Sequence, residues 1–578
     1  MKTTIVCSLM ILITSINALA QDIESLVKAP LLTTSGGISM SQITTLTPGD
    51  SAVNDNPYAL YLAGNLSLNL FGTVSVPLSF AYTNQQLSKS VSLPFNRFSI
   101  APSYKWVKVY AGYTSMQFSP YSLAGHELFG GGVELTPDNG FKISAVYGRL
   151  QKQSFGEDGA DPAFKRMGGG FAVEYKKDRY EVGINVFKAQ DVLSSRYLAQ
   201  PDSMDVMPED NLTGSVKVGI NFIKDLQLSA EYGISALNRN INSNGNATGN
   251  SFQLLKTDGD LAVYHALKAG LTYTKNIGSI GATYERVDPN YTTLGAYYMT
   301  NDYENITANF STSIIKKFNI ALNGGYQKDN LEKQKNNTSF RVIYSANISS
   351  NLTEKLNLSL NLSNLQSYVY INDVYSQVTQ TNEFQNLDTL NVTQLNYTMS
   401  FNSSYVLQSS KEKRQSVSLN LMYQKSAEAQ QYSRFSGNDI YNTSVSYQLS
   451  LLPIKFNAST SVSYNDNKMS GNDYMQAFTY NLSLQKTFFS DLRSGLIGTY
   501  SNMSNPAGKL SDVINLRLSE SYLLAKKHNF NLSFIMLYSE SALKSRTQYS
   551  VNLSYAYNFN VTIDRKDKKL KLEYNFRK

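Results

Sequence analysis

The side chains most suited to chemistry are sparse and scattered in this sequence. The three histidines, His126, His265 and His528, lie far apart, and the one cysteine, Cys7, lies close to the N-terminus. No HExxH motif, paired cysteines or clustered histidines and carboxylates occur, so the spacing predicts no metal site and no cofactor. A G-x-S-x-G elbow and a P-loop are absent too. We therefore expect no enzyme; the alternative is a hydrolase whose serine, histidine and polar partner come from distant strands.

Charged side chains recur instead at positions that alternate with apolar ones. Acids and bases share these positions in the first half, whereas later segments carry asparagine and serine there, as in residues 356–363. Charges of both signs are expected in any hydrated interior. The alternatives are that they support a plug through salt bridges, or that Arg341 or Arg517 contributes a weak ion preference. The predicted interior charges are Glu134, Glu174, Lys217, Glu231, Lys268, Glu285, Arg341 and Arg517.

A period of two runs through most of the chain and accounts for this alternation. Leu60, Leu62, Leu66 and Leu68 alternate with polar or small residues, and the pattern resumes after a turn at 71–73. A period of two is that of a β-strand with one apolar and one polar face. The chain contains 12% aromatic residues, too many for a disordered protein. Its mean hydropathy of -0.29 and lack of long apolar runs after the N-terminus exclude a polytopic helical membrane protein.

The apolar faces of these strands need a covering that the chain itself does not supply. No amphipathic helical run of convincing length occurs, and a soluble solenoid or propeller would carry fixed-period Gly or Trp-Asp signatures that are missing. Lipid can cover the apolar faces if the sheet closes on itself, because closure satisfies every backbone group. We predict an all-β fold, a single large antiparallel transmembrane β-barrel of about 26 strands, with a range of about 24 to 28. Its diameter of roughly 50 Å requires a lumen that is flattened, filled or occupied.

The N-terminus has the features of a secretory signal peptide. Lys2 precedes an apolar stretch over residues 5–16 and the small-x-small pattern Ala18-Leu19-Ala20. We predict a signal peptide over residues 1–20, a short periplasmic segment over 21–35 and the barrel over 36–578. Short lysine-rich turns alternate with long loops, which predicts periplasmic turns, extracellular loops and the outer membrane of a Gram-negative bacterium.

Two segments between strands are richer in aromatic and small residues than surface loops usually are. They are residues 115–130, SMQFSPYSLAGHELFG, and residues 288–302, DPNYTTLGAYYMTND. We predict that they fold into or over the lumen as a constriction or plug; the alternative is that they pack against each other outside the membrane. The residues predicted to form this constriction are Phe118, Tyr121, His126, Tyr291, Tyr297 and Tyr298.

Two phrases carry a more specific resemblance. Two segments are similar to segments in a set of large Gram-negative outer-membrane β-barrel proteins. They are FNRFSIAPSYKWVKVYAGYTSMQFSPYSLAGHELFGGGVEL and RVDPNYTTLGAYYMTNDYENIT. The alternating C-terminal residues Leu570, Leu572, Tyr574 and Phe576 resemble the signal that the barrel assembly machinery reads, although Arg577 and Lys578 follow the phenylalanine. The resemblance implies that outer-membrane lipid and this machinery are partners. A TonB-dependent transporter would carry a plug domain before its barrel, and this chain has too few residues there.

Two classes of function follow from this architecture. The first is a channel or gated pore for a polar solute or an exported polymer, with a lumen partly filled by loops. The second is a barrel that does not transport and instead anchors a secretion, adhesion or envelope assembly, with an envelope protein as partner. The net charge of +8 is small for 578 residues, so no nucleic-acid partner is expected.

Overall fold

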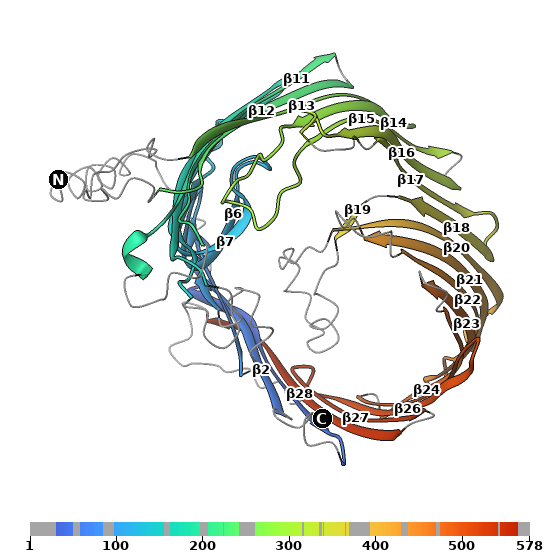
Figure 1. Ribbon diagram of the computed structural model, residues 1–578. Coiled ribbons are helices and arrows are strands. Elements are labelled where there is room, and N and C mark those ends of the chain that lie inside the picture. The colour runs from blue at the N-terminus through green and yellow to red at the C-terminus, as the bar shows by residue number, and fades with distance from the viewer. Residues whose placement is uncertain are drawn as a thin grey trace.

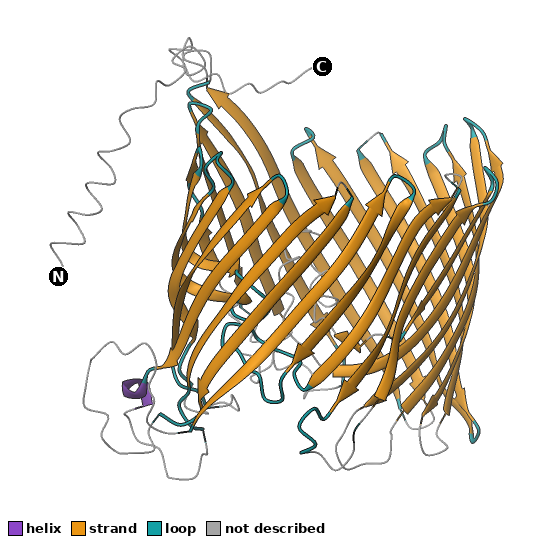
Figure 2. Ribbon diagram, turned by 90° about the horizontal axis from the view of Figure 1, so that it is seen from above, coloured by secondary structure: helices purple, strands orange, loops and turns teal. Residues whose placement is uncertain are grey.

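The chain folds into a single closed β-barrel (Figures 1 and 2). The computed structural model describes residues 30–49, 58–84, 97–154, 162–196, 206–223, 225–241, 260–314, 317–334, 338, 340–364, 366–368, 393–428, 437–469, 474–489, 491–541 and 544–563. Within these residues the one helical element is the short 3-10 helix η3 (Leu193–Arg196). No helix in these ranges is long and apolar enough to cross a membrane.

Successive strands pair antiparallel around the barrel. The 28 strand segments make 26 barrel strands, because β4 and β5 both lie between β3 and β6, and β18 and β19 both pair with β20. The segments are β1 (Leu32–Leu46), β2 (Tyr58–Leu70), β3 (Val74–Thr83), β4 (Arg97–Ile100), β5 (Ser103–Tyr104), β6 (Val107–Gln117), β7 (Ala124–Leu135), β8 (Phe141–Gln151), β9 (Arg166–Lys177), β10 (Tyr180–Asp191), β11 (Asp210–Ile223), β12 (Leu226–Asn238), β13 (Leu261–Lys275), β14 (Gly278–Val287), β15 (Tyr303–Ile314), β16 (Phe318–Asp329), β17 (Phe340–Asn351), β18 (Leu356–Ser363), β19 (Gln366–Tyr368), β20 (Thr393–Ser409), β21 (Lys413–Glu428), β22 (Gly437–Leu451), β23 (Phe456–Met469), β24 (Tyr474–Phe488), β25 (Leu492–Asn505), β26 (Gly508–Leu524), β27 (His528–Ser541) and β28 (Ser545–Ile563).

The barrel closes between its first and last strands. β1 pairs antiparallel with β28 from Leu32 opposite Ile563 to Leu46 opposite Tyr549, so the blue and red strands meet in Figure 1. This closure confirms the predicted all-β antiparallel barrel and its 26 strands. The barrel begins at Leu32 and not at the predicted residue 36, because Thr33 and Thr34 pair on both sides although they lack apolar alternation.

The outer face of the barrel is apolar, as a lipid-facing surface requires. Large hydrophobic side chains are exposed on every long strand, for example Ile184, Leu482 and Leu553. Aromatic pairs lie toward both ends of the strands: Phe141 contacts Tyr175 near the short turns, and Tyr423 contacts Tyr441 near the long loops. An apolar band between two aromatic girdles is the exterior of an outer-membrane barrel, and this is the location we assign to the protein.

The two ends of the barrel differ in the length of their connections. Turns at one end are short, such as residues 136–140 and 178–179, and those at the other end are mostly longer (Figure 2). β1 begins and β28 ends at the short-turn end. By the rule for outer-membrane barrels this end faces the periplasm and the long-loop end faces the outside of the cell.

Candidate functional site: a hairpin and a loop inside the barrel

The tip of the β6–β7 hairpin leaves the barrel wall. β6 pairs with β4 only through Ala111 and Gly112, and β7 pairs with β8 only from Phe129 onward. Residues 113–128 therefore extend beyond the pairing of both neighbouring strands. In Figure 1 this part of β6 and β7 lies inside the ring. We call residues 113–128 the inner hairpin.

The backbone at the base of the inner hairpin makes this bend possible. Gly112 has a φ of 96°, and a β-carbon there would lie 2.2 Å from the carbonyl oxygen of Phe98. Gly125 has a φ of 78°, and the register between β6 and β7 shifts between Ser115 and Gln117. Positive φ favours glycine, and a β-bulge bends a strand. These features turn the hairpin away from the wall and toward the lumen.

The loop between β14 and β15, residues 288–302, lies beside the inner hairpin inside the barrel (Figure 1). We call it the inner loop. It closes on itself, because the Asp302 N–H donates to the Asp288 carbonyl at 3.2 Å. The Asn301 side-chain amide also donates to the Tyr291 carbonyl at 2.9 Å. These bonds give the loop a fixed shape over its whole length.

Hydrogen bonds join the inner loop to the inner hairpin. The Tyr291 hydroxyl donates to the Tyr121 carbonyl at 2.7 Å, and the Thr293 hydroxyl donates to the Ser122 carbonyl at 2.6 Å. The Ala124 N–H donates to the Gly295 carbonyl at 2.9 Å. Two segments that are far apart in sequence therefore form one unit, which we call the inner plug.

Polar side chains of the wall hold the inner plug in place. Ser119 donates to Glu231, the Tyr121 hydroxyl donates to Glu285 at 2.7 Å, and Ser122 donates to Asn185 at 2.5 Å. The Leu294 N–H donates to Asn211 at 3.0 Å on the loop side. These contacts spread over β10, β11, β12 and β14, so the plug is docked on one arc of the wall.

Apolar packing reinforces this docking. One buried cluster joins wall residues to the plug: Met116, Leu123, Leu128, Val146, Phe187, Ala189 and Leu294. A second joins Tyr121, Ala266, Val287 and Tyr291. Phe187, Leu123 and Tyr291 are completely or almost completely buried. Burying such side chains is worth about 1.5–3 kcal/mol each, so the plug is a packed structure.

The six predicted constriction residues all belong to the inner plug. Tyr121 and Tyr291 are buried at its centre, Phe118 packs against the first apolar cluster, and His126 stacks on Tyr297 with ring centroids 3.8 Å apart. Tyr298 is the exposed member. Burial raises the pKa of Tyr291 above its ordinary value and that of Tyr297 to about 12. The predicted segment 115–130 is mostly strand, since the β6–β7 connection spans residues 118–123 alone.

The predicted interior charges of the first half form a paired row along the wall beneath the plug. Glu134 pairs with Lys142 at 3.2 Å, Lys217 pairs with Glu181, and Lys268 pairs with Glu285 at 3.5 Å. The register aligns Lys142 with Glu174, and Lys217 and Lys268 with Glu231. Positive and negative charges therefore compensate each other on this arc. The side chain of Arg341 and the predicted terminal signal, Leu570, Leu572, Tyr574 and Phe576, lie outside what the structure describes.

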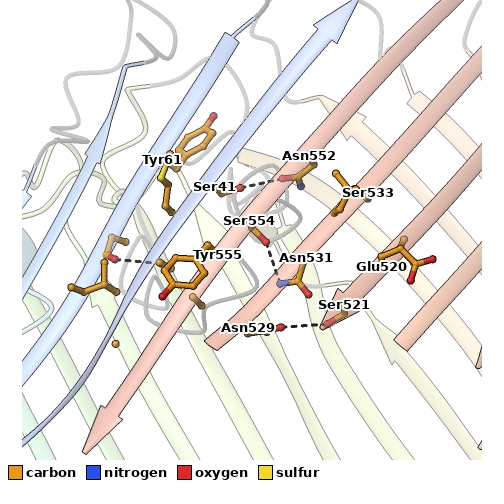
Figure 3. A pocket seen from close by; sticks show the side chains of 18 of the residues that line it. Ser41, Tyr61, Glu520, Ser521, Asn529, Asn531, Ser533, Asn552, Ser554 and Tyr555 are labelled. Carbon is orange, nitrogen blue, oxygen red and sulfur yellow. Dashed lines mark hydrogen bonds between the residues drawn. The ribbon is translucent and has the colours of Figure 1, made fainter. Parts of the chain in front are cut away.

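The opposite arc of the wall is different in composition and carries a hollow of about 670 Å³. Figure 3 shows asparagine and serine side chains around it, from β1 and from β26 to β28. Hydrogen bonds link neighbours across strands, such as Ser41 to Asn552 at 3.2 Å and Asn531 to Ser554 at 3.2 Å. Arg493 and Arg517 line the same hollow. We call this surface the polar hollow.

Two parts of the site were not predicted from the sequence. The first part is Phe187 and Ala189, which face inward although the inward face was expected to be polar. Their positions alternate with those of the outward-facing Val182 and Ile184, and this alternation could have shown that they point inward. Arg493 was missed because it directly follows a turn at the start of β25. Among the described residues, no group of three or more His, Cys, Asp and Glu side chains could hold a metal ion.

Several solved structures are similar to the barrel at low sequence identity. It is similar to the P pilus usher PapC translocation pore (10% identity, 91% of this chain and 99% of that chain, TM-score 0.38). It is also similar to the copper transporter OprC (10%, 91% and 80%, TM-score 0.39) and to Pseudomonas aeruginosa OccK8 (9%, 92% and 100%, TM-score 0.31). No family model and no curated protein matches the sequence. Conclusions about the fold come from the strand pairing described above.

Proposed function

We propose that this protein is an outer-membrane channel whose lumen is narrowed from one side by the inner plug. The route for a polar solute or an exported polymer runs between the plug and the polar hollow. A barrel of 26 strands has a diameter of roughly 50 Å, which would breach the permeability barrier if the lumen were fully open.

One observation supports the proposal above the others: the inner plug is docked on a single arc. Its wall contacts come from β4, β8 and β10 to β14, through residues such as Arg97, Val146 and Asn185. The polar hollow lies on β1, β2 and β24 to β28, away from these contacts. A polar solute on this route would meet hydroxyl and amide groups. These groups can replace the hydrogen bonds that the solute makes with water, and these groups carry no charge that would have to be desolvated.

Planar-bilayer recording of the purified full-length protein tests the proposal. We expect a small, discrete conductance from the wild type, and a conductance at least about twofold larger when residues 289–301 are replaced by a short Gly-Ser linker. The deletion removes the inner loop and its bonds to Tyr121 and Ser122 while leaving every barrel strand intact. An unchanged conductance in the deletion variant would overturn the narrowing by the inner plug, and the lack of any current in both proteins would overturn the channel function.

A further inference from the structure

The polar hollow contains two arginines whose charge is uncompensated by the surrounding described residues. Arg493 and Arg517 are exposed and line the hollow. No acidic side chain among the described residues forms an ion pair with either. The one acid that borders the hollow, Glu520, accepts a hydrogen bond from Ser494 at 2.5 Å and lies on the same side of β26 as Leu516 and Leu518, which are exposed on the outer face.

The opposite arc makes this pattern informative. There the inward lysines Lys142, Lys217 and Lys268 each have a carboxylate partner on a neighbouring strand. Among the described residues, these lysines on the arc that carries the plug are therefore paired, whereas Arg493 and Arg517 at the polar hollow form no ion pair. A guanidinium without a protein partner is available to a carboxylate or phosphate of a ligand.

The residues between the two arginines supply a second kind of contact. In the register, Arg493 faces Ser521 and Arg517 lies four residues away on the same strand as Ser521. The two arginine Cα atoms are therefore about 14 Å apart, from the strand rise and spacing. Ser519 lies between these positions on β26 and pairs with Ser533 of β27, and Asn531 and Asn552 lie beside Ser533. Hydroxyl and amide groups can both donate and accept, as sugar hydroxyls require.

We propose that the polar hollow binds an anionic oligosaccharide, with Arg493 and Arg517 holding its acidic groups and the serine and asparagine rows holding its hydroxyls. The inference rests on the proposed channel function and names the class of solute that follows the route. Neither element alone would select this class: arginines alone would favour any small anion, and the serine and asparagine rows alone would favour any neutral sugar.

Equilibrium binding to the detergent-solubilised full-length protein tests the site without requiring a current. By calorimetry we expect trigalacturonate to bind at least about tenfold tighter than maltotriose, a neutral trisaccharide with the same α-1,4 linkage, and than succinate, an anion without the sugar hydroxyls. R493Q and R517Q should each weaken trigalacturonate binding by about tenfold. Glucose 6-phosphate in place of trigalacturonate tests whether a phosphate serves as the anion; binding that depends on the same two arginines supports the site.

Arg546 provides the matched control. It shares the inward alternation of Gln548 and Asn552 on β28, but it lies at the far end of that strand and does not line the hollow. R546Q removes the same charge and should leave binding within about twofold of the wild type. Equal binding of trigalacturonate, maltotriose and succinate would overturn the proposal, and so would an equal loss in R546Q and R517Q. Selective binding by a protein that gives no current would remove the channel function and leave the site standing.

Discussion

The Tyr291 hydroxyl donates a hydrogen bond of 2.7 Å to the backbone carbonyl of Tyr121, across 170 residues of sequence. Both side chains are buried, and their rings meet edge to face with centroids 6.2 Å apart. This contact joins the inner loop to the inner hairpin. The proposed narrowing of the lumen therefore depends on two segments that must dock together.

Removing this hydroxyl should loosen the inner plug. Y291F leaves the Tyr121 carbonyl buried without this donor, which costs about 1–3 kcal/mol of docking free energy. We expect brief high-conductance excursions in bilayer recordings and faster proteolysis within residues 288–302. Y147F alters a tyrosine on the outer face and should reproduce the wild type. Indistinguishable records for Y291F and the wild type would show that the bond does not hold the plug.

A methyl group at Gly233 should displace the hairpin tip. A β-carbon there would lie 2.6 Å from the β-carbon of Tyr121, closer than such atoms approach. We expect G233A to raise the mean conductance, with a docking cost of about 1–3 kcal/mol, while the barrel keeps its heat-modifiable migration on gels. G324A adds the same methyl where nothing lies within 4 Å and should have no effect. Equal conductance of the two variants would contradict the predicted clash.

Truncating Phe187 should weaken the apolar support of the plug. Phe187 is completely buried against Leu123 and Leu294, so F187A is expected to cost about 3–5 kcal/mol. Most of this loss falls on docking, because Phe187 contacts the plug from the wall. F171A, on the outer face of the neighbouring strand β9, is the control. Both variants are compared by their conductance and by protease cleavage of the inner loop. The hypothesis that Phe187 supports the plug fails if F171A opens the channel as much as F187A.

Alkaline pH should release the inner loop at Tyr297. Burial raises the pKa of this phenol to about 12, so the folded state retains a proton that an undocked tyrosine loses near pH 10. The docked state binds more protons between pH 10 and 12, and its stability falls as pH rises through that window. We expect conductance to increase over this range in the wild type. In Y297F the increase should be smaller; an identical pH profile would rule out Tyr297 as its source.

The period of two was sufficient to predict the fold. It depends on each strand having one lipid face and one lumen face, which the sequence records residue by residue from Leu60 to Leu553. The predicted strand number combined the count of apolar runs with the even number of strands in single-chain bacterial barrels. The start of β1 was missed at Thr33 and Thr34, where pairing occurs without apolar alternation.

The inner plug was only partly predictable. Its unusual aromatic composition is visible in the sequence, but the bonds from Ser119 to Glu231 and from Tyr121 to Glu285 join residues that only the closed barrel brings together. The inward position of Phe187 depends on the plug that covers it. Arg493 could not be separated from the lysines and arginines of the short turns, since it lies at the edge of one.

The seam between β1 and β28 constrains how this molecule can be made. Leu32 and Ile563 lie opposite each other in the strand register, yet almost the whole polypeptide must be synthesised between them. Until β28 is in place, the first strand has an unpaired edge on the side that β28 will occupy, and unpaired edges invite wrong partners. A chain that stops before Ser545 would leave two such edges on a large apolar sheet. A nascent chain of this kind has to be shielded from its earliest strand to its last.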